Sequence, residues 1–252
     1  MILVGGPLAI SLGRRGVMVS GGVAFFLGAL MLASAWHWAQ LVEGRIFVGI
    51  GIGFINASVP TYISEVAPPN LRGGLNMLFQ LMTAIGIFAA SVINWGVAHY
   101  SWGWRFSLGN VCFLALNFII NAALCPDSPN SILEHDPANV QRARKTLQEL
   151  RPDNYDVDQE LEEIRTNAIK TRMQSFSGSL NLLFSRPHRK QAMAAMLIPY
   201  FQQFSGISFL MFYAPQLFNI TGNSVDTALA ITCLFTGVNV LGTIIGILCV
   251  DE

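Results

Sequence analysis

Charged residues are scarce in this chain, and their scarcity excludes several classes of protein. Only 12% of the 252 residues are Asp, Glu, Lys or Arg, about half of the roughly 25% typical of a soluble domain. The formal net charge is zero, so nothing in the charge balance favours nucleic acid as a partner. Hydrophobic residues make up 52% of the chain, and the mean hydropathy is +0.48. This composition indicates a membrane protein.

Cysteine and histidine are also few, and their positions argue against metal chemistry and catalysis. The cysteines stand singly in apolar runs, without the paired spacing of metal ligands. They are interpreted as small buried hydrophobic residues: Cys112, Cys125, Cys233 and Cys249. The histidines lie near loops or helix ends and indicate neither a metal site nor an activated nucleophile: His37, His99, His135 and His188. We therefore expect no enzymatic activity and no cofactor.

The charges that are present gather in one segment. Twenty of the thirty charged residues lie between Asp127 and Lys190, and the remainder of the chain contains six charge-free runs of 19 residues or longer: 16–42, 46–64, 73–104, 106–126, 191–225 and 227–250. A bilayer is crossed by a helix of about 20 apolar residues. The sequence therefore predicts an all-α, polytopic transmembrane bundle with helices at about 1–12 (partial), 16–36, 40–64, 73–97, 104–124, 190–217 and 226–250.

Basic residues in the loops predict the orientation and the domain division. One side of the membrane receives Arg14, Arg15, Arg72 and the ten basic residues from Arg142 to Lys190, whereas the other side receives only Arg105. Because Lys and Arg concentrate in cytoplasmic loops, the first side is predicted to be cytoplasmic. The expected domains are a first transmembrane half at 1–125, a cytoplasmic linker at 126–189 and the start of a second half at 190–252.

The charged linker carries helical patterns of its own. Asp136 followed by Pro137 predicts a helix start, with Asp as the N-cap, and apolar residues then recur at helical spacing from Val140 to Leu150. A second such pattern runs from Val157 to Ala168, after a group of acidic residues suited to a helix N-terminus. Two short amphipathic helices with a solvated charged face are expected, and no catalysis.

Two adjacent glutamines, Gln202 and Gln203, interrupt a run without charges. Each amide needs hydrogen-bond partners that hydrocarbon does not offer. Because neighbouring helical residues point about 100° apart, both amides suit a broad cavity better than a narrow seam between helices. Isolated asparagines elsewhere fit either helix pairing or a water-filled path. Amides and hydroxyls without charges suit a sugar, whose apolar faces aromatic side chains such as Phe201 can cover.

Two further features concern helix packing and the cytoplasmic edge. Gly49 and Gly53 have the spacing that lets membrane helices approach closely. Glu65 and Arg72 are expected near the Gly13-Arg14-Arg15 loop, where an ion-pair network that breaks during a conformational change is plausible.

Several short motifs follow one another in order along the chain: Gly13-Arg14-Arg15, Gly44-Arg45, Pro60-Thr-Tyr-Ile-Ser-Glu-Val-Ala-Pro68, Arg72-Gly73, Gln80 with Gly86-Ile87, Pro126-Asp-Ser-Pro-Asn-Ser131, Gln202-Gln203 with Gly206-Ile207, Phe212-Tyr-Ala-Pro215 and Asn239. In this order and spacing they resemble the sugar porters of the major facilitator superfamily, and most of all the plant-type monosaccharide–proton symporters. The resemblance covers nearly the whole chain.

This resemblance implies a hexose bound between two six-helix halves, with access alternating as the halves rock. The residues implied to contact sugar are Gln80, Gln202, Gln203 and Asn239, with Ile87 as an apolar wall and Ser208 where an asparagine is usual. Arg45 matches the arginine that partners a protonatable aspartate on the first helix. Arg14, Arg15, Glu65 and Arg72 match the cytoplasmic network that stabilises the outward-facing state. The implied partners are a monosaccharide, protons and the lipid bilayer, and the implied location is the plasma membrane.

The sequence departs from the family pattern in places. Ile10 stands where the loop motif has an acidic residue, and Ser208 puts one sugar hydrogen bond in doubt. Residues 1–12 lack the marks of a signal peptide and are interpreted as the end of a helix whose beginning is absent, and four further helices are expected after Glu252. A chain of this extent is not expected to transport sugar alone.

Two alternatives to the hexose–proton symporter stay open at this point. The first is a facilitative sugar uniporter, which the missing first helix would distinguish by its acidic residue. The second is a truncated product that does not transport and acts as a partner or a sensor. A membrane enzyme is a distant third.

Overall fold

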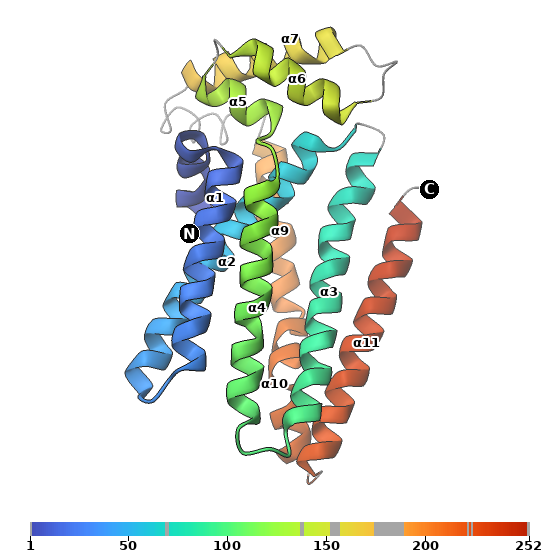
Figure 1. Ribbon diagram of the computed structural model, residues 1–252. Helices are drawn as coiled ribbons and strands as arrows, with labels where there is room; N and C mark the ends of the chain where they lie inside the picture. Colours follow the sequence, from blue (N-terminus) through green and yellow to red (C-terminus); the bar gives the residue numbers. More distant parts are fainter. Residues whose placement is uncertain are drawn as a thin grey trace.

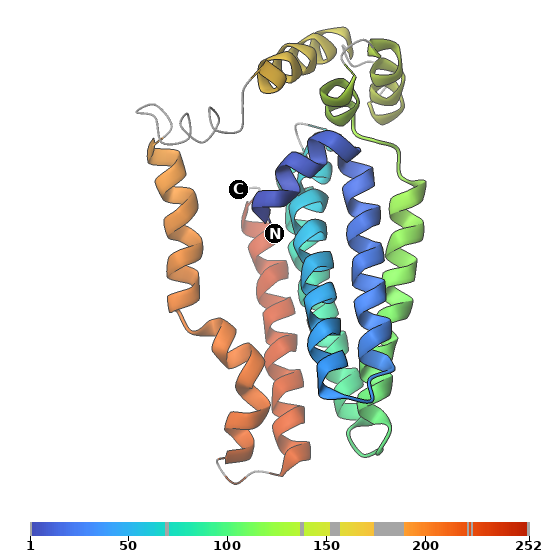
Figure 2. The ribbon, with the colours of Figure 1, turned by 90° about the vertical axis from the view of Figure 1, so that its left-hand side faces the viewer.

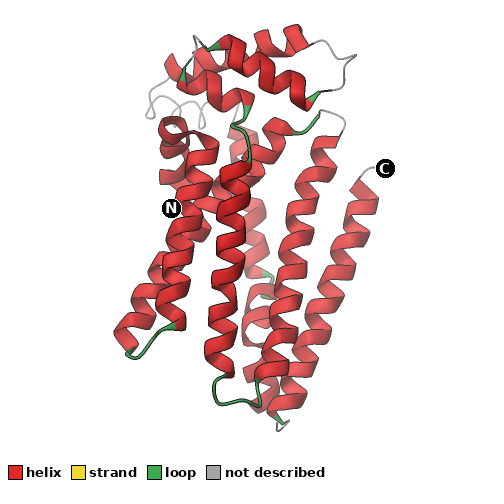
Figure 3. Ribbon diagram, in the orientation of Figure 1, coloured by secondary structure: helices red, strands yellow, loops and turns green. Residues whose placement is uncertain are grey.

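The computed structural model describes residues 2–68, 71–136, 139–151, 157–173, 189–220, 222 and 224–250. Every regular element among them is a helix (Figure 3), which confirms the all-α fold class. The helices are α1 (Ile2–Ala33), α2 (Trp38–Val66), α3 (Arg72–Val97), α4 (Gly103–Leu124), α5 (Pro129–His135), α6 (Val140–Leu150), α7 (Val157–Met173), α9 (Arg189–Phe204), α10 (Ile207–Ile220) and α11 (Val225–Val250).

Long apolar helices form the body of the molecule. Among the described residues, five spans are long and apolar enough to cross a membrane: Leu12–Ala33, Trp38–Val66, Gly73–Val97, Gly103–Leu124 and Val225–Ile247. They run lengthwise through the bundle, while α5, α6 and α7 cover one end of it (Figure 1). That end is called the linker end below. Large apolar side chains such as Leu234 and Phe113 are exposed on these spans, as expected where lipid replaces water. The chain is a multi-pass integral membrane protein.

Close contact between α1 and α2 depends on glycine. A Cβ atom on Gly51 would lie 2.6 Å from the backbone nitrogen of Phe25, and one on Gly28 would lie 2.6 Å from that of Val48. Only residues without a side chain allow the two backbones to approach this closely. The prediction that Gly49 takes part in such packing is wrong, because a Cβ atom there meets nothing within 4 Å. The contact face of α2 is the one that carries Gly44 and Gly51.

Two glycines interrupt helices by adopting positive φ. Gly13 has φ +73° and breaks α1 at the predicted loop between residues 12 and 16. Gly206, with φ +72°, separates α9 from α10. The prediction of one continuous helix over 190–217 is therefore wrong. Hydropathy could not reveal this break, because both halves are apolar, but a glycine in the left-handed region ends a helix readily.

The linker helices pack around a small apolar core of their own. Leu133 of α5 and Leu147 of α6 are fully buried, and Leu161 of α7 is nearly so. Figure 2 shows α5, α6 and α7 gathered at one end of the bundle, with α9 standing apart on one side and α10 beside α11. The predicted amphipathic helices correspond to α6 and α7, which confirms that both exist.

Helix α5 was not predicted, and the predicted helix start at Asp136 is wrong. Asp136 is the C-cap of α5, and Pro137 lies outside the described residues. The helix that follows Asp136 is α6, and its N-cap is Asn139. The N-cap of α5 is Ser128, whose side chain accepts a hydrogen bond from the Ser131 backbone N–H, with Pro129 in the first turn. Ser followed by Pro is a sequence signal for a helix start, so this helix could have been recognised.

The opposite end of the bundle is rich in exposed aromatic side chains. The Arg105 guanidinium lies 5.0 Å from the centre of the Trp36 ring and 4.9 Å from that of Trp104. This arrangement ties the turn between α1 and α2 to the start of α4 by cation–π attraction. At the same end, His99 Nε2 lies 3.1 Å from Asp226 Oδ1, which connects the α3–α4 turn to α11. Exposed tryptophans at a helix end are typical of a membrane interface.

Gly51→Ala should lower the thermal stability of the detergent-solubilised protein, because the added methyl group would meet backbone atoms of α1. The expected loss is about 1–3 kcal/mol, as for an overpacked core. Gly49→Ala makes the same chemical change on the same helix but faces open space, and it is the matched control. Equal losses in melting experiments on the two variants would contradict the assigned packing face.

Candidate functional site

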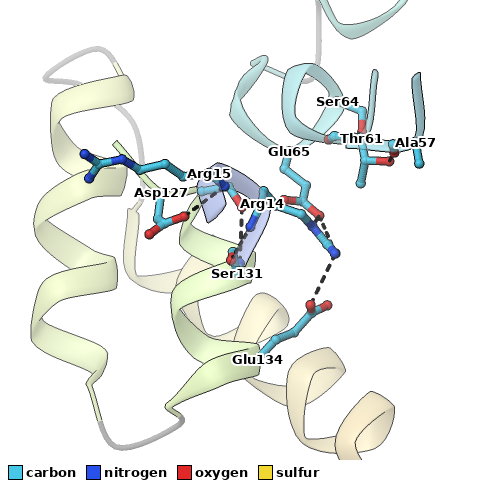
Figure 4. Close-up of polar contacts among 10 residues, drawn as sticks. Arg14, Arg15, Ala57, Thr61, Ser64, Glu65, Asp127, Ser131 and Glu134 are labelled. Carbon is cyan, nitrogen blue, oxygen red and sulfur yellow. Dashed lines mark hydrogen bonds and ion pairs between the residues drawn. The ribbon is translucent and has the colours of Figure 1, made fainter. Parts of the chain in front are cut away.

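A cluster of hydrogen bonds and ion pairs lies at the linker end, around Arg14 (Figure 4). The Arg14 guanidinium donates to Oε1 of Glu65 from both Nε, at 3.2 Å, and Nη2, at 3.1 Å. The other Glu65 oxygen accepts a hydrogen bond from the Ser128 hydroxyl. Both charged side chains are largely buried, with 13% of Arg14 and 8% of Glu65 exposed. This ion pair joins α1 to α2, and Ser128 connects it to the start of α5.

A second carboxylate contacts the same guanidinium. Arg14 Nη2 lies 3.2 Å from Oε2 of Glu134 on α5. Burial raises the pKa of Glu134, and the nearby Glu65 carboxylate raises it further, while Arg14 acts in the opposite direction. Burial is the largest of these effects, so the attraction of Arg14 does not fully offset the cost of ionising this group. One cation is therefore shared unequally between Glu65 and Glu134.

The break at Gly13 explains why side chains gather here. Its positive φ interrupts α1, so the next backbone N–H groups need acceptors from outside the helix. The Arg14 N–H donates to Ser131 Oγ at 3.1 Å, and the Arg15 N–H donates to Asp127 Oδ1 at 3.2 Å. Asp127, between α4 and α5, and Ser131 of α5 thus cap the second part of α1. A Cβ atom on Gly13 would lie 3.1 Å from Ser131 Oγ.

The residues predicted to form the cytoplasmic network do not all contact one another. Arg14 and Glu65 meet directly, whereas the Arg15 guanidinium donates to the Ala123 carbonyl at the end of α4. The side chain of Arg72 lies outside the described residues. Tyr62 adds a further connection, since its hydroxyl donates to the Pro126 carbonyl at 2.9 Å.

Sequence reasoning did not assign roles to several members of this cluster. Asp127, Ser128 and Ser131 belong to a motif that was quoted without a contact partner. Glu134 lies on the helix that was not predicted. The signal that could have found them is the Ser-Pro helix start, which places Ser131 and Glu134 on the first turns of α5. As built, this cluster is a set of contacts that fastens α1, α2, α4 and α5 together at one end.

Two of the predicted sugar-binding residues lie at the end of α9, away from the Arg14 cluster. Gln202 and Gln203 occupy the last turn of α9, directly before the break at Gly206, and both are exposed. The break is short: the Ser205 N–H still donates to the Phe201 carbonyl, and its hydroxyl donates to the Gln202 carbonyl at 2.6 Å. Tyr200 and Phe204 lie beside them, with ring centres 4.6 Å apart. The side chain of Ser208 lies outside the described residues.

The remaining predicted residues lie on two helices that run side by side, α3 and α11 (Figure 1). A Cβ atom on Gly237 of α11 would lie 3.4 Å from the ring of Phe88 on α3, which marks where the helices touch. Ile87 precedes Phe88, and Asn239 follows Gly237 by two residues. Gln80 lies two turns before Ile87 and is exposed. Helix α10 packs against α11, which brings the end of α9 to the same side.

Arg45 occupies the second turn of α2, towards the end opposite the linker, and is exposed. Among the described residues, its guanidinium forms no hydrogen bond or ion pair. Within the ranges that the structure describes, Cys, His, Asp and Glu residues form no group of three or more that could hold a metal ion. Cys112, Cys125 and Cys233 are free and half-buried, and the side chain of Cys249 lies outside the described residues.

Comparisons with known proteins place these helices in a family. The family model described as "Sugar (and other) transporter" matches residues 2–252. The chain is 41% identical to Sugar transport protein 7 of Arabidopsis thaliana, over 99% of this chain and 48% of that protein. It therefore spans about half the length of the curated relative that it matches.

Solved structures show the same fold. A structure of the proton:xylose symporter XylE bound to 6-bromo-6-deoxy-D-glucose aligns with 100% of this chain and 57% of that chain, at 25% identity and a TM-score of 0.83. An inward open structure of the xylose transporter XylE from E. coli aligns with 99% of this chain and 56% of that chain, at 23% identity and a lower TM-score of 0.73. Both alignments cover nearly all of this chain, so the chain shares their helical fold.

Glu65→Gln and Glu134→Gln should differ in their effects on stability. Glu65→Gln should cost about 3 kcal/mol, because it leaves the buried Arg14 without its main counter-charge. Glu134→Gln should cost less than about 1 kcal/mol, because a neutral amide avoids the burial of a second carboxylate while its oxygen still accepts from Arg14. Melting of the solubilised variants measures both, and equal losses would contradict the unequal sharing of Arg14.

The pH dependence of the stability of Glu134→Gln tests whether burial raises the pKa of Glu134. An unfolded glutamate titrates at about 4.3, below the raised pKa of Glu134 in the folded protein. Between these values the folded state binds more protons, so wild-type stability falls as pH rises through this window. The variant lacks the titrating group and should gain relative to wild type over the same window. A stability difference that is independent of pH would refute the burial effect.

Proposed function

The chain belongs to the sugar transporter family, and from this premise we propose that it serves the transport of a monosaccharide across a membrane, coupled to protons. The names of its relatives support this proposal, since one is a sugar transport protein and another is a proton:xylose symporter. The observation that carries it is the helix break at Gly206 beside two exposed amides. Transporter substrates bind where membrane helices are interrupted.

The break supplies hydrogen-bonding groups of the kind a sugar requires. At the end of α9 the side chains of Gln202 and Gln203 are exposed. Amides donate and accept, as sugar hydroxyls do. Tyr200 and Phe204 offer apolar ring faces at the same place. We propose that a hexose binds here, with Gln80, Ile87, Ser208 and Asn239 completing the site from α3, α10 and α11.

The Arg14 cluster is proposed as the gate at the linker end. Its contacts join α1, α2 and α5, and in this proposal they break when the bundle opens at this end. In this proposal the linker end faces the cytoplasm and the membrane is the plasma membrane. Residues 1–125, 126–189 and 190–252 act as first half, linker and part of the second half.

Labelled hexose uptake tests the function and the site together. Residues 1–252 replace the matching segment of Sugar transport protein 7, and the chimera is expressed in cells that lack hexose transport. Gln202→Leu and Gln203→Leu should each weaken apparent affinity about tenfold or more, because each lost hydrogen bond is worth about 1–3 kcal/mol. Gln216→Leu, an exposed glutamine on α10, is the matched control and should leave uptake unchanged. No saturable uptake by the unmodified chimera, at normal surface expression, would overturn the proposed function.

Arg45→Gln tests proton coupling in the same chimera. An arginine inside a membrane helix is costly without a partner, and we propose that this partner is a protonatable carboxylate. Sugar-induced alkalinisation of the medium should then fall relative to sugar uptake, and uptake should lose its pH dependence. Arg45→Lys retains the charge and should keep part of the coupling. An unchanged ratio of protons to sugar in Arg45→Gln would favour a uniporter.

A further inference from the structure

A second arginine at the linker end, Arg151, is more deeply buried than Arg14. It follows α6 as its C-cap, and only 1% of its side chain is exposed. Its guanidinium binds Glu160 of α7 through two parallel hydrogen bonds, from Nε to Oε2 at 2.9 Å and from Nη2 to Oε1 at 2.7 Å. Such a planar, two-point contact is specific to arginine among the basic residues.

The other edge of the same guanidinium contacts a transmembrane helix. Nη1 donates to the Val66 carbonyl at 2.9 Å, and Nη2 lies 3.5 Å from the Ala67 carbonyl. These are the last residue of α2 and its C-cap. Helix C-termini leave carbonyls without partners and attract positive charge. Arg151 therefore caps α2 from 84 positions further along the chain and holds it against α7.

The capped turn of α2 is the turn that carries Glu65. Glu65 immediately precedes Val66, and its carboxylate accepts both hydrogen bonds from the Arg14 guanidinium. A shift of this turn would move the Glu65 carboxylate away from Arg14. We propose that Arg151 is a positioning residue for the gate: it fixes the end of α2 so that Glu65 meets Arg14, and thereby couples the linker helices to opening at this end. The gate role rests on the proposed transport function.

A neighbouring ion pair provides a matched control. Arg144 of α6 lies 2.9 Å from Asp158 of α7, so it joins the same two helices as Arg151 does. Both side chains of this pair are at least half exposed, and an exposed pair contributes little to stability. Arg144→Gln thus removes a linker ion pair without touching the end of α2.

The labelling rate of a native thiol reports on the gate without any transport. Cys125 is free, half-buried and directly precedes Pro126, whose carbonyl accepts a hydrogen bond from Tyr62 of α2. A water-soluble maleimide is applied to the chain in membrane vesicles, and modification of Cys125 is followed by peptide mass spectrometry. Arg151→Gln should raise this rate about tenfold, as expected for the loss of a charge-assisted hydrogen bond. Arg151→Lys should fall between, and Arg144→Gln should match wild type.

A double variant separates positioning from general support of the fold. If Arg151 acts through Glu65, Arg151→Gln should add little to the labelling rate already raised by Glu65→Gln, because coupled residues are not additive. Independent, multiplying effects would overturn the proposal, and so would a wild-type rate in folded Arg151→Gln. Should Arg151→Gln fail to fold, Arg151→Lys with and without Glu65→Gln provides the same comparison. Uptake by the chimera is measured separately. If the chimera does not transport sugar, the labelling rates still test whether Arg151 positions Glu65.

Discussion

The contact between Arg14 and Glu65 is the interaction on which the linker end depends. It is a largely buried ion pair between two membrane-spanning helices, and a buried charge is tolerated only when it is paired and hydrogen-bonded. The structure meets this condition with the Ser128 hydroxyl on Glu65 and with Glu134 on Arg14. Arg14 lies on α1 and Glu65 on α2, while Ser128 and Glu134 both belong to α5. The ion pair therefore requires α1, α2 and α5 to be in place at once, and removing one segment leaves a buried charge in the others.

Polar groups are distributed in two distinct ways in this molecule. At the linker end they are satisfied by other parts of the chain, as with Arg151 between Glu160 and the end of α2. On α3 and at the end of α9, Gln80 and Gln202 are exposed instead. Satisfied groups hold helices together, whereas exposed amides in an apolar helix are suited to a ligand. This contrast is the physical basis for assigning the gate to one region and the sugar site to the other.

Helix lengths were predictable from the sequence where charge alone determines them. The predicted helices at 40–64, 73–97, 104–124 and 226–250 agree with α2, α3, α4 and α11 to within about two residues at each end, because long stretches with few charges are what the hydrocarbon accepts. Backbone events inside apolar runs were not predictable this way. Hydropathy treats the glycine at 206 like its neighbours, and only its φ reveals the break. Gly49 and Gly51 likewise look the same in the sequence, and only the contact with α1 shows that Gly51 is the one at the helix interface. Glu134 was missed because α5 has only seven residues, too few to give a clear apolar pattern.

The break at Gly206 also constrains how the chain enters the membrane during synthesis. Helices α9 and α10 have 16 and 14 residues, each shorter than the roughly 20 needed to span the hydrocarbon, so they must insert as one segment. The interrupted backbone between them cannot remain exposed to lipid. Helix α11 is the next to emerge from the ribosome, and α10 packs against it. Stable insertion of this segment therefore waits for the helix that follows it, and the residues proposed to bind sugar are assembled only after α11 has been synthesised.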